Sequence, residues 1–496
     1  MRQFFALAVL AVLSMAVVAE AGDKSYWIAT NERHESFDRD PGWDGINNHP
    51  DSDDARTVVQ NFGYSPTTYC VDTPGEIGGT ISPAARPASY GLRIASANFS
   101  THLSASGTLK CISGKFHVQL GFFNSKTRNE WRTPNTISIR LLGRGDKFIA
   151  FTEYATSKWR AGGDSPGGFD TEPAIDNSAK RRQPRGFPLG QTLPWNLDYN
   201  PDGADGAGLI TVHLGGQSAT CRIAPEHRTD GAVFDRFGLM TVVKSATNGG
   251  EVWIGGLTVN GQKPDLKVKE AWDADGNRET YSTTDVRPHG NFGFSQTHFA
   301  AGAGAGELGG LIFRGDCRYK YRMAAYGDRL EALDLQTSLH ASGKIALCQG
   351  VSDSAVLIGF YHSKDSLTVG DDQSSLLPAC FLGLVLEGPS REGFLLRPML
   401  CTRKLDATEN AIARRPHIYP DGTSHEWDLR YDPNGAGGNG EMTLRMDGKD
   451  LNVPLKAGMK SSKTRFDRFG IVTTWVDGNG QRVYLDDLTY TFRAER

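Results

Sequence analysis

Short apolar runs, rich in β-branched and aromatic residues, recur along the chain between stretches of Gly, Asn, Asp and Pro. In the first half they cover residues 117–123, 136–142, 147–154, 209–214, 238–243 and 251–259, and in the second half residues 355–361, 381–387, 393–400, 442–446, 470–476 and 482–490. Runs of this length and composition are typical of β-strands. Helical periodicity is scarce, so the pattern predicts an all-β protein.

The chain also repeats itself once. Seven blocks recur in the same order, among them N-F-G-Y-S at 61–65 and N-F-G-F-S at 291–295, and F-D-R-F-G at 234–238 and 466–470. The period of about 230 residues is too long for a solenoid unit and fits one large β domain. Many strands in that length imply two packed sheets, so we predict two tandem β-sandwiches of the jelly-roll type.

A polar stretch between the copies gives the predicted domain limits. We expect a signal peptide at residues 1–21, a first domain at 22–262, a linker at 263–275 and a second domain at 276–496. Arg2, the apolar run that follows it and the motif ending at Ala21 match a cleaved signal peptide. No later apolar run reaches the ~20 residues of a transmembrane helix. We therefore expect a secreted or periplasmic protein without a transmembrane segment.

Composition narrows these classes further. The 496 residues include 58 Gly and 23 Pro, which disfavours a helical bundle. Hydrophobic residues make up 39% of the chain, enough for real cores, and the formal charge of -3 gives no sign of a general polyanion binder or of nucleic-acid binding. The seven cysteines are too few for a disulfide scaffold, and their odd number leaves at least one thiol over.

The late strands of each copy carry a resemblance to a known family. W-x-L-x-Y-x-P-x-G occurs at 195–203 and 427–435, each time followed by F-D-R-F-G, and the second copy closes with Y-L-D-D-L-T-Y at 484–490. This progression resembles the late strands of concanavalin A-like lectin/glucanase jelly rolls, including laminin-G-like modules. The resemblance implies tandem jelly rolls that bind or process carbohydrate outside the cell, by analogy of fold.

Two glutamates occupy matching places in the copies. Glu76 and Glu307 each lie in a G-E-[IL]-G-G block, where a carboxylate is suited to acid, base or nucleophilic chemistry on a glycosidic bond. The alternative is that the glycines form a bend and the glutamate pairs locally. The E-x-D-x-x-E strand of jelly-roll glucan hydrolases is absent, as are the R-[TS]-E-L-R and Q-[IV]-H strands of alginate lyases. The absence of these strands argues against a jelly-roll glucan hydrolase or alginate lyase of the known types.

A polar group in the first copy is a second candidate site. It comprises His117, Gln119, Arg140, Glu153 and Tyr154, on neighbouring predicted strands. The second copy has Ala355 in place of His117 and, in one alignment, Val385 in place of Arg140. An Arg, His and Tyr set is suited to holding a uronate carboxylate and abstracting a proton, as polysaccharide lyases do. The alternative is polar residues on the solvent face of half-buried strands.

Basic loops and tryptophans supply candidate ligand contacts. Arg181 and Arg182 precede one repeated tryptophan, and Arg414 and Arg415 precede its counterpart at a similar distance. Paired guanidinium groups are suited to carboxylate or sulfate, although charged loops are often only solvated. Trp131 and Trp159 are candidates for stacking on sugar rings, with packing as the alternative.

The chain gives only an incomplete calcium signature. Residues 198–203 match the opening D-x-N-x-D-G of a calcium loop, but Leu209 stands where Glu is needed, and Arg430 replaces Asp198 in the second copy. A hairpin turn is the better explanation, and calcium stays open. No other cofactor is indicated. We therefore expect an exported tandem jelly roll that binds an acidic polysaccharide; the alternatives are a lyase or glycoside hydrolase acting in domain 1, and a structural or adhesive surface protein.

Overall fold

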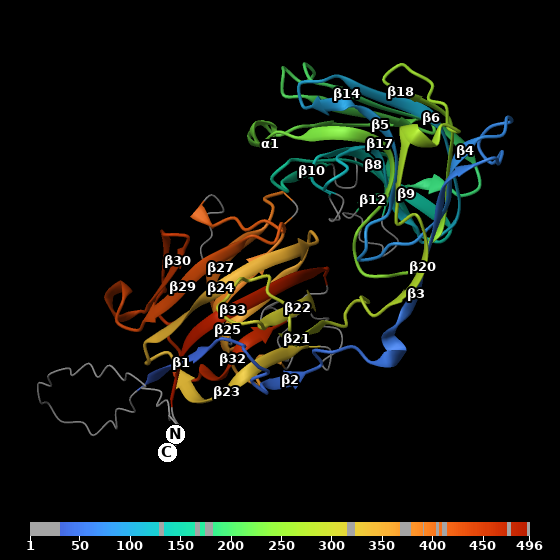
Figure 1. Cartoon of the computed structure of the whole chain (residues 1–496). Helices are drawn as coiled ribbons and strands as arrows, with labels where there is room; N and C mark the ends of the chain where they lie inside the picture. Colours follow the sequence, from blue (N-terminus) through green and yellow to red (C-terminus); the bar gives the residue numbers. More distant parts are fainter. Residues whose placement is uncertain are drawn as a thin grey trace, which may run out of the picture.

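The computed structural model describes residues 30–127, 133–163, 169–173, 182–314, 323–367, 378–389, 391–402, 406–408, 414–473 and 478–493. Within them the regular structure is almost entirely β-strand, and the one α-helix is the short α1 (Pro225–Asp230). Antiparallel sheets stack in two pairs, one pair for each copy of the repeat (Figure 1). The predicted all-β fold of packed sheets is confirmed. The predicted signal peptide lies outside the described residues.

The first sandwich has a back sheet and a front sheet. The back sheet has the order β16 (Gln217–Arg222), β15 (Leu209–Leu214), β14 (Thr192–Asn200), β6 (Leu103–Gly114), β18 (Gly250–Val259), β4 (Glu76–Ile81), β3 (Arg56–Ser65) and β20 (Arg278–Thr283). The front sheet has the order β10 (Ala161–Gly163), β9 (Lys147–Ala155), β8 (Thr136–Gly143), β7 (His117–Phe123), β17 (Val233–Thr241), β5 (Ser89–Asn98) and β19 (Trp272–Asp275), with β13 (Phe187–Pro188) beside β9. A small ribbon joins β11 (Thr171–Pro173) and β12 (Arg182–Pro184).

The second sandwich repeats this plan. Its back sheet has the order β21 (Asn291–Ser295), β22 (Glu307–Phe313), β33 (Gly480–Phe492), β24 (Leu339–Gly350), β29 (Ser424–Asp432), β30 (Glu441–Met446) and β31 (Lys449–Pro454), with β1 (Asn31–Glu35) beside β33. Its front sheet has the order β2 (Asp44–Ile46), β23 (Ala325–Asp334), β32 (Arg465–Val472), β25 (Ala355–Tyr361), β26 (Phe381–Glu387), β27 (Leu395–Cys401) and β28 (Asp406–Thr408).

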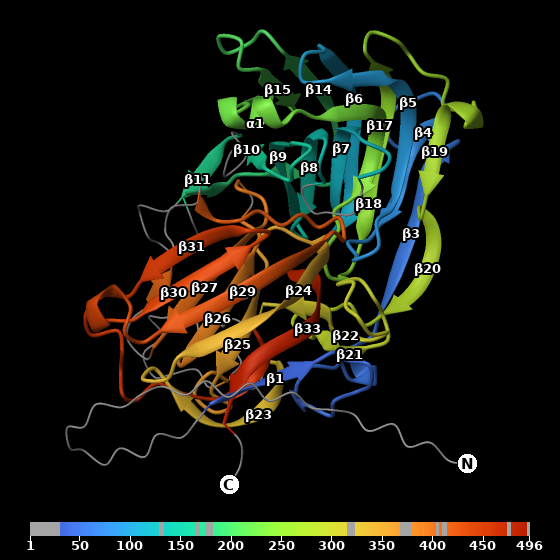
Figure 2. The same cartoon turned by 60° about the vertical axis from the view of Figure 1, so that its left-hand side comes forward.

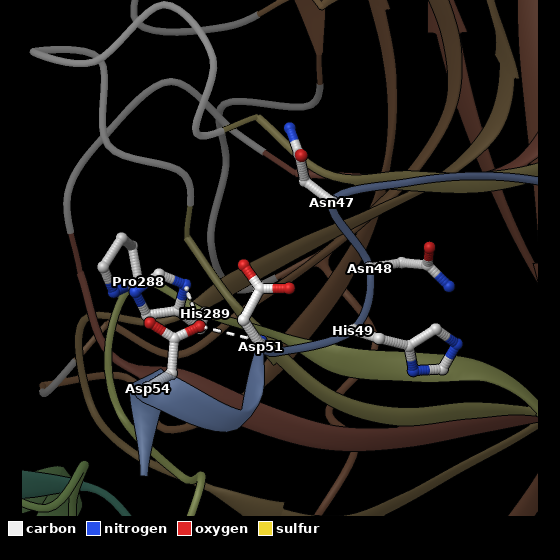
Figure 3. Close-up of a pocket in the computed structure, with 7 residues that line it drawn as sticks. All are labelled: Asn47, Asn48, His49, Asp51, Asp54, Pro288 and His289. Carbon is white, nitrogen blue, oxygen red and sulfur yellow. Dashed lines mark hydrogen bonds and ion pairs between the residues drawn. The ribbon is translucent and has the colours of Figure 1, made fainter. Parts of the chain in front are cut away.

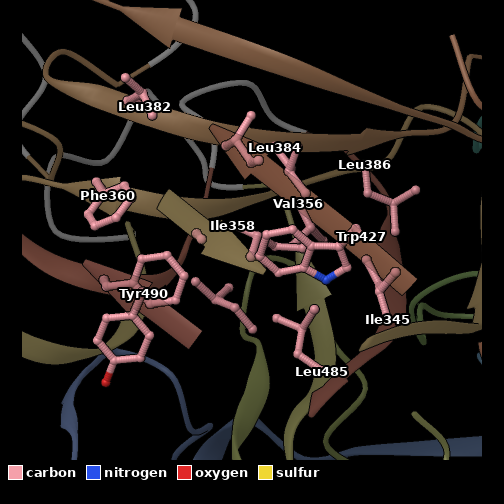
Figure 4. Packing of buried hydrophobic residues seen from close by; sticks show 14 of the residues in the cluster. Ile345, Val356, Ile358, Phe360, Leu382, Leu384, Leu386, Trp427, Leu485 and Tyr490 are labelled. Atoms are coloured by element: carbon pink, nitrogen blue, oxygen red, sulfur yellow. The ribbon is translucent and has the colours of Figure 1, made fainter. Parts of the chain in front are cut away.

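Each sandwich encloses its own apolar core. Alternation along a strand sends every second side chain toward the facing sheet. In the second sandwich, Ile345 and Leu485 of the back sheet and Val356 of the front sheet surround Trp427 in this way (Figure 4). The central strands β7 and β25 of the front sheets are also buried on their outer faces, because every residue of both strands is buried. Residues on those outer faces are therefore enclosed without belonging to the main cores.

The strands that precede each copy in the sequence pair with sheets of the other copy. β1 and β2, at the N-terminal end of the described chain, pair with β33 and β23 of the second sandwich. β19 and β20 precede the second copy in sequence, yet they pair with β5 and β3 of the first sandwich. Figure 1 shows β1 and β2 beside the strands of the second copy, and Figure 2 shows β1 there from another side. The domain limits drawn from the sequence stay a prediction, and these pairings show which sheets the flanking segments join.

Two further properties bear on the expected environment. No helix in the described part of the chain is both long and apolar enough to cross a membrane. Cys70, Cys111 and Cys348 are free thiols. Burial raises the pKa of the Cys70 and Cys348 thiols to about 12, so neither side chain is a ready nucleophile.

Candidate functional site

The front sheet of the first sandwich brings four predicted site residues onto one face. His117 and Gln119 lie on β7, Arg140 on β8 and Glu153 on β9, and the register sets Gln119 directly opposite Arg140. Arg140 donates from Nη1 to Nε2 of His117 over 2.8 Å, and its Nη2 lies 2.7 Å from Oε1 of Glu153. We call these four residues the polar cluster. Only 2–5% of the surface of His117, Arg140 and Glu153 is exposed.

Arg140 organises the electrostatics of the polar cluster. Its guanidinium carbon lies 3.9 Å from the ring centre of Phe151, so the cation also has an aromatic face beside it. Burial, followed by the charge of Arg140, holds the pKa of His117 well below its usual range. Because an arginine only donates, His117 accepts at Nε2 and is the neutral tautomer with its proton on Nδ1. The basic nitrogen of His117 is therefore already engaged.

Tyr154 is not part of this cluster. It follows Glu153 on β9, and successive side chains on a strand point to opposite faces. Its hydroxyl lies inside the sandwich, 3.0 Å from Nδ1 of His227, and accepts the backbone N–H of Ala224 over 3.0 Å. Burial raises the pKa of Tyr154 to about 12. The His, Arg and Tyr set that the sequence suggested is thus divided between two faces of the sheet.

The second sandwich carries apolar residues at the same positions. Gly121 faces Ser138 in one copy as Gly359 faces Gly383 in the other, which fixes the alignment of the strands. The equivalents are Ala355 for His117, Leu357 for Gln119, Val385 for Arg140 and Met399 for Glu153. These four residues belong to a separate apolar cluster on the outer face of their sheet. The architecture therefore does not depend on ionisable groups at these positions.

An open pocket of about 240 Å³ lies on the front sheet of the first sandwich, on the β5 and β19 side. Arg236 and Asp273 line it, and Nε of Arg236 lies 2.5 Å from the Asp273 carboxylate. Arg93 bonds to the same carboxylate over 2.5 and 2.8 Å. Sequence reasoning did not identify these residues. The repeated F-D-R-F-G block contains Arg236 and was the available signal, but Asp273 lies in the predicted linker.

Glu76 and Glu307 lie elsewhere, buried in the two back sheets. Glu307 accepts the backbone N–H groups of Phe299 and Ala300 over 2.9 and 2.7 Å. Glu76 accepts the N–H of Cys70 over 3.2 Å. Burial raises the pKa of Glu76. Each glutamate thus ties down the loop before its strand, as the alternative interpretation of the G-E-[IL]-G-G blocks expected.

Arg182 and Arg415 of the predicted basic loops each bond to a residue outside the polar cluster. Arg182 donates to Thr171 within the β11–β12 ribbon. Arg415 bonds to Glu387 of the second sandwich over 2.8 Å. Arg414 precedes it and is also held by contacts. Trp131 and Arg181 lie outside the described residues.

Trp159 lies between the two sandwiches. Its ring stacks on Tyr419 of the second copy at 5.5 Å and packs against the second core. This contact uses the ring for packing between the copies, which was the alternative to sugar stacking.

The turn with the partial calcium signature has a local explanation. Asp202 donates its backbone N–H to the side chain of Asn200 over 2.9 Å, and Asp198 lies 2.9 Å from His102. The first contact belongs to the β14–β15 hairpin turn, and the second ties β14 to the start of β6. Among the residues that the structure describes, no group of three or more His, Cys, Asp or Glu side chains is arranged to hold a metal ion.

No protein-family model and no curated protein matches the chain. Solved structures that match include the carbohydrate recognition domain of Emp47p, with 12% identity, 41% of this chain and 89% of that chain covered, and a TM-score of 0.25. Domains LG4-5 of the mouse laminin alpha1 chain match with 10% identity, coverages of 84% and 91%, and a TM-score of 0.20. The alginate lyase Aly36B, solved with an alginate trisaccharide, matches with 11% identity, coverages of 41% and 88%, and a TM-score of 0.26.

The carbohydrate recognition domain and the laminin domains belong to the classes that the sequence resemblance names, and the alginate lyase is a further class. At these identities and TM-scores they carry no argument about function. The sandwich architecture rests on the strand pairing of the chain itself.

Proposed function

We propose that this chain is an exported carbohydrate-binding protein and that the front sheet of its first sandwich engages an acidic polysaccharide. The observation that carries the proposal is the polar cluster, which is buried in one copy and replaced by apolar residues in the other. A buried ion pair contributes little to stability compared with apolar side chains. Its presence in one copy only therefore supports a functional role.

An exposed guanidinium group beside the pocket on the same sheet, that of Arg93, supports an anionic ligand. Arg93 and Arg236 both pair with Asp273, and Arg236 also lies 3.5 Å from Asp235, so the charges of this group are largely balanced within it. Guanidinium groups bind carboxylate or sulfate through paired hydrogen bonds. Arg93 is more than half exposed and is accessible to such a group.

A lyase or glycoside hydrolase acting in the first sandwich is the second candidate, favoured by the neutral His117 beside Arg140. A neutral imidazole is the form that accepts a proton. In the observed arrangement, however, its Nε2 already accepts from Arg140, and Tyr154 lies on the other face. Binding without chemistry therefore agrees better with the geometry. A structural or adhesive role is the third alternative, expected if no glycan is retained.

Affinity electrophoresis through gels containing polygalacturonate, alginate, a sulfated glycan or a neutral glucan tests the proposal. We expect retardation by an acidic polysaccharide and loss of retardation in the triple variant His117→Ala, Arg140→Val, Glu153→Met. Arg445→Ala is the matched charge control, because Arg445 is an exposed residue of the second back sheet. Retardation by none of the glycans would overturn the proposal. Ultraviolet absorbance of unsaturated uronates appearing in the same mixtures would favour the lyase instead.

A further inference from the structure

The same short segment precedes each copy of the repeat and docks onto the other copy. Residues 43–48 read W-D-G-I-N-N and residues 272–277 read W-D-A-D-G-N. The first segment contains β2 and pairs with β23 of the second sandwich; the other contains β19 and pairs with β5 of the first. The segment that precedes the first copy thus docks onto the second sandwich, and the segment that precedes the second copy docks onto the first sandwich.

The tryptophan and the aspartate make equivalent contacts at both places. Trp43 lies 5.9 Å from the ring of Tyr326, and its counterpart Trp272 stacks on a matching tyrosine at 5.1 Å. Both tryptophans belong to the core of the receiving sandwich. Asp44 lies 2.9 Å from Arg468 and 3.3 Å from Arg329, as Asp273 pairs with two arginines in the first sandwich.

The asparagine completes the recognition. Asn48 donates from its side chain to the carbonyl of Phe292 over 2.6 Å, and its backbone carbonyl accepts the N–H of the same residue over 2.9 Å. Asn277 makes the same two bonds to Phe62, over 2.5 and 3.0 Å. The residue before each asparagine has a left-handed backbone, with φ of 48° at Asn47 and 59° at Gly276. The receiving phenylalanines are those of the repeated N-F-G blocks.

The second sandwich obtains its segment from the far end of the chain. In the first sandwich, β19 follows β18 after a short connection. In the second, the segment arrives together with β1, whose Asn31 pairs with Phe492. We call residues 31–48 the clasp. Phe37 and Trp43 are the large apolar side chains that the clasp adds to the second core.

The clasp leaves the second sandwich along the wall of an open pocket. Residues 47–54 pass Pro288 and His289 there and enclose a pocket of about 520 Å³ (Figure 3). His289 lies 3.1 Å from Asp54, and His49 contacts Asn291 over 3.0 Å. The large apolar side chains of the clasp, Phe37 and Trp43, lie at the docking site and not at this crossing.

We propose that the second sandwich carries a docking site for a Trp-Asp-x-x-x-Asn segment, which the clasp fills from within the chain. After opening, the partner that fits this site is the clasp of a second copy of this chain. A segment that is distant in sequence can be exchanged between identical chains without any new contact. The proposal does not depend on glycan binding.

Cutting the connection tests the docking site in the folded full chain. A specific protease site is inserted between Ser52 and Asp53, which are both exposed. After cutting, we expect the N-terminal fragment to co-elute with the rest of the chain. A labelled peptide of residues 30–50 should replace it, with the Trp43→Ala peptide about tenfold weaker or worse. Loss of the fragment in native buffer, with the near-ultraviolet dichroism of the remainder unchanged, would overturn the docking site, and so would equal binding of both peptides.

Exchange between chains is tested without cutting. Two populations with different affinity tags are mixed at high concentration in moderate urea and returned to buffer. We expect mixed dimers on size-exclusion chromatography with light scattering, and none from chains carrying Trp43→Ala and Asp44→Asn. Monomers alone, or equal dimer formation by these variants, would overturn the exchange between copies.

Discussion

Replacing residues of the polar cluster with those of the second copy tests whether the cluster serves glycan binding or the stability of the fold. The variant carries His117→Ala, Arg140→Val and Glu153→Met, which are the side chains of Ala355, Val385 and Met399 at equivalent strand positions. The second sandwich already buries this apolar set in the same geometry. The exchange therefore removes the charges without placing side chains that the fold has not accommodated elsewhere.

The expected magnitudes follow from burial. Arg140→Val alone leaves Glu153, 2% exposed, without the guanidinium 2.7 Å away, and breaking a buried pair in this way costs about 3–5 kcal/mol. Replacing the whole set avoids the isolated charge, and such replacements are often neutral or stabilising. The smaller valine leaves some space and loses the contact with Phe151, which offsets part of that gain. We expect the triple variant to lie within about 2 kcal/mol of the wild type.

Urea unfolding monitored by tryptophan fluorescence and by circular dichroism measures both free energies on the full chain. The single variant should show a lower midpoint, and the triple variant a midpoint close to that of the wild type, with similar slopes. The same samples should lose retardation by acidic polysaccharide. If the triple variant is as unstable as the single variant, the polar cluster is structural. If it is stable and still binds glycan, the cluster is not the binding site, and both results refute the reasoning.

Three other changes have defined outcomes. Burial holds the pKa of His117 low in the folded chain, so the unfolded chain binds more protons as pH falls through about 6.5. The wild type should therefore lose stability relative to the triple variant between pH 7 and pH 5, as measured by paired urea titrations. Burial raises the pKa of Asp486 to about 6 in the folded chain. The stability contributed by its protonated carboxyl group is therefore present at low pH and lost as pH rises through about 6. Asp486→Asn should raise the melting temperature at pH 8 more than at pH 5. Glu307→Ala should lower the unfolding free energy by about 2–3 kcal/mol and speed hydrogen exchange at the Phe299 and Ala300 amides, whereas unchanged exchange would contradict its role in holding the loop.

The local sequence pattern predicted the positions of strands and the faces of their side chains, because these depend on neighbouring residues. The apolar run at residues 117–123 coincides with β7, and strand periodicity placed His117 and Gln119 on one face. The same periodicity separates Glu153 from Tyr154, so their assignment to one site conflicted with a rule available from the sequence. Pairing between distant segments was not predictable in this way. Nothing near Asn31 indicates that its partner is Phe492, because the register of distant strands is set by packing of the whole sandwich.

The copies are informative both where they agree and where they differ. Shared blocks serve contacts that each sandwich needs: the phenylalanine of N-F-G receives an asparagine, and the arginine of F-D-R-F-G receives an aspartate. Such contacts constrain both copies equally, so the blocks are retained together. The polar cluster meets no such requirement, because the second sandwich folds around apolar residues at the same positions. Within one duplicated chain, shared motifs therefore report how the sandwiches are joined, and a difference at buried, equivalent positions indicates where a function specific to one copy is to be sought.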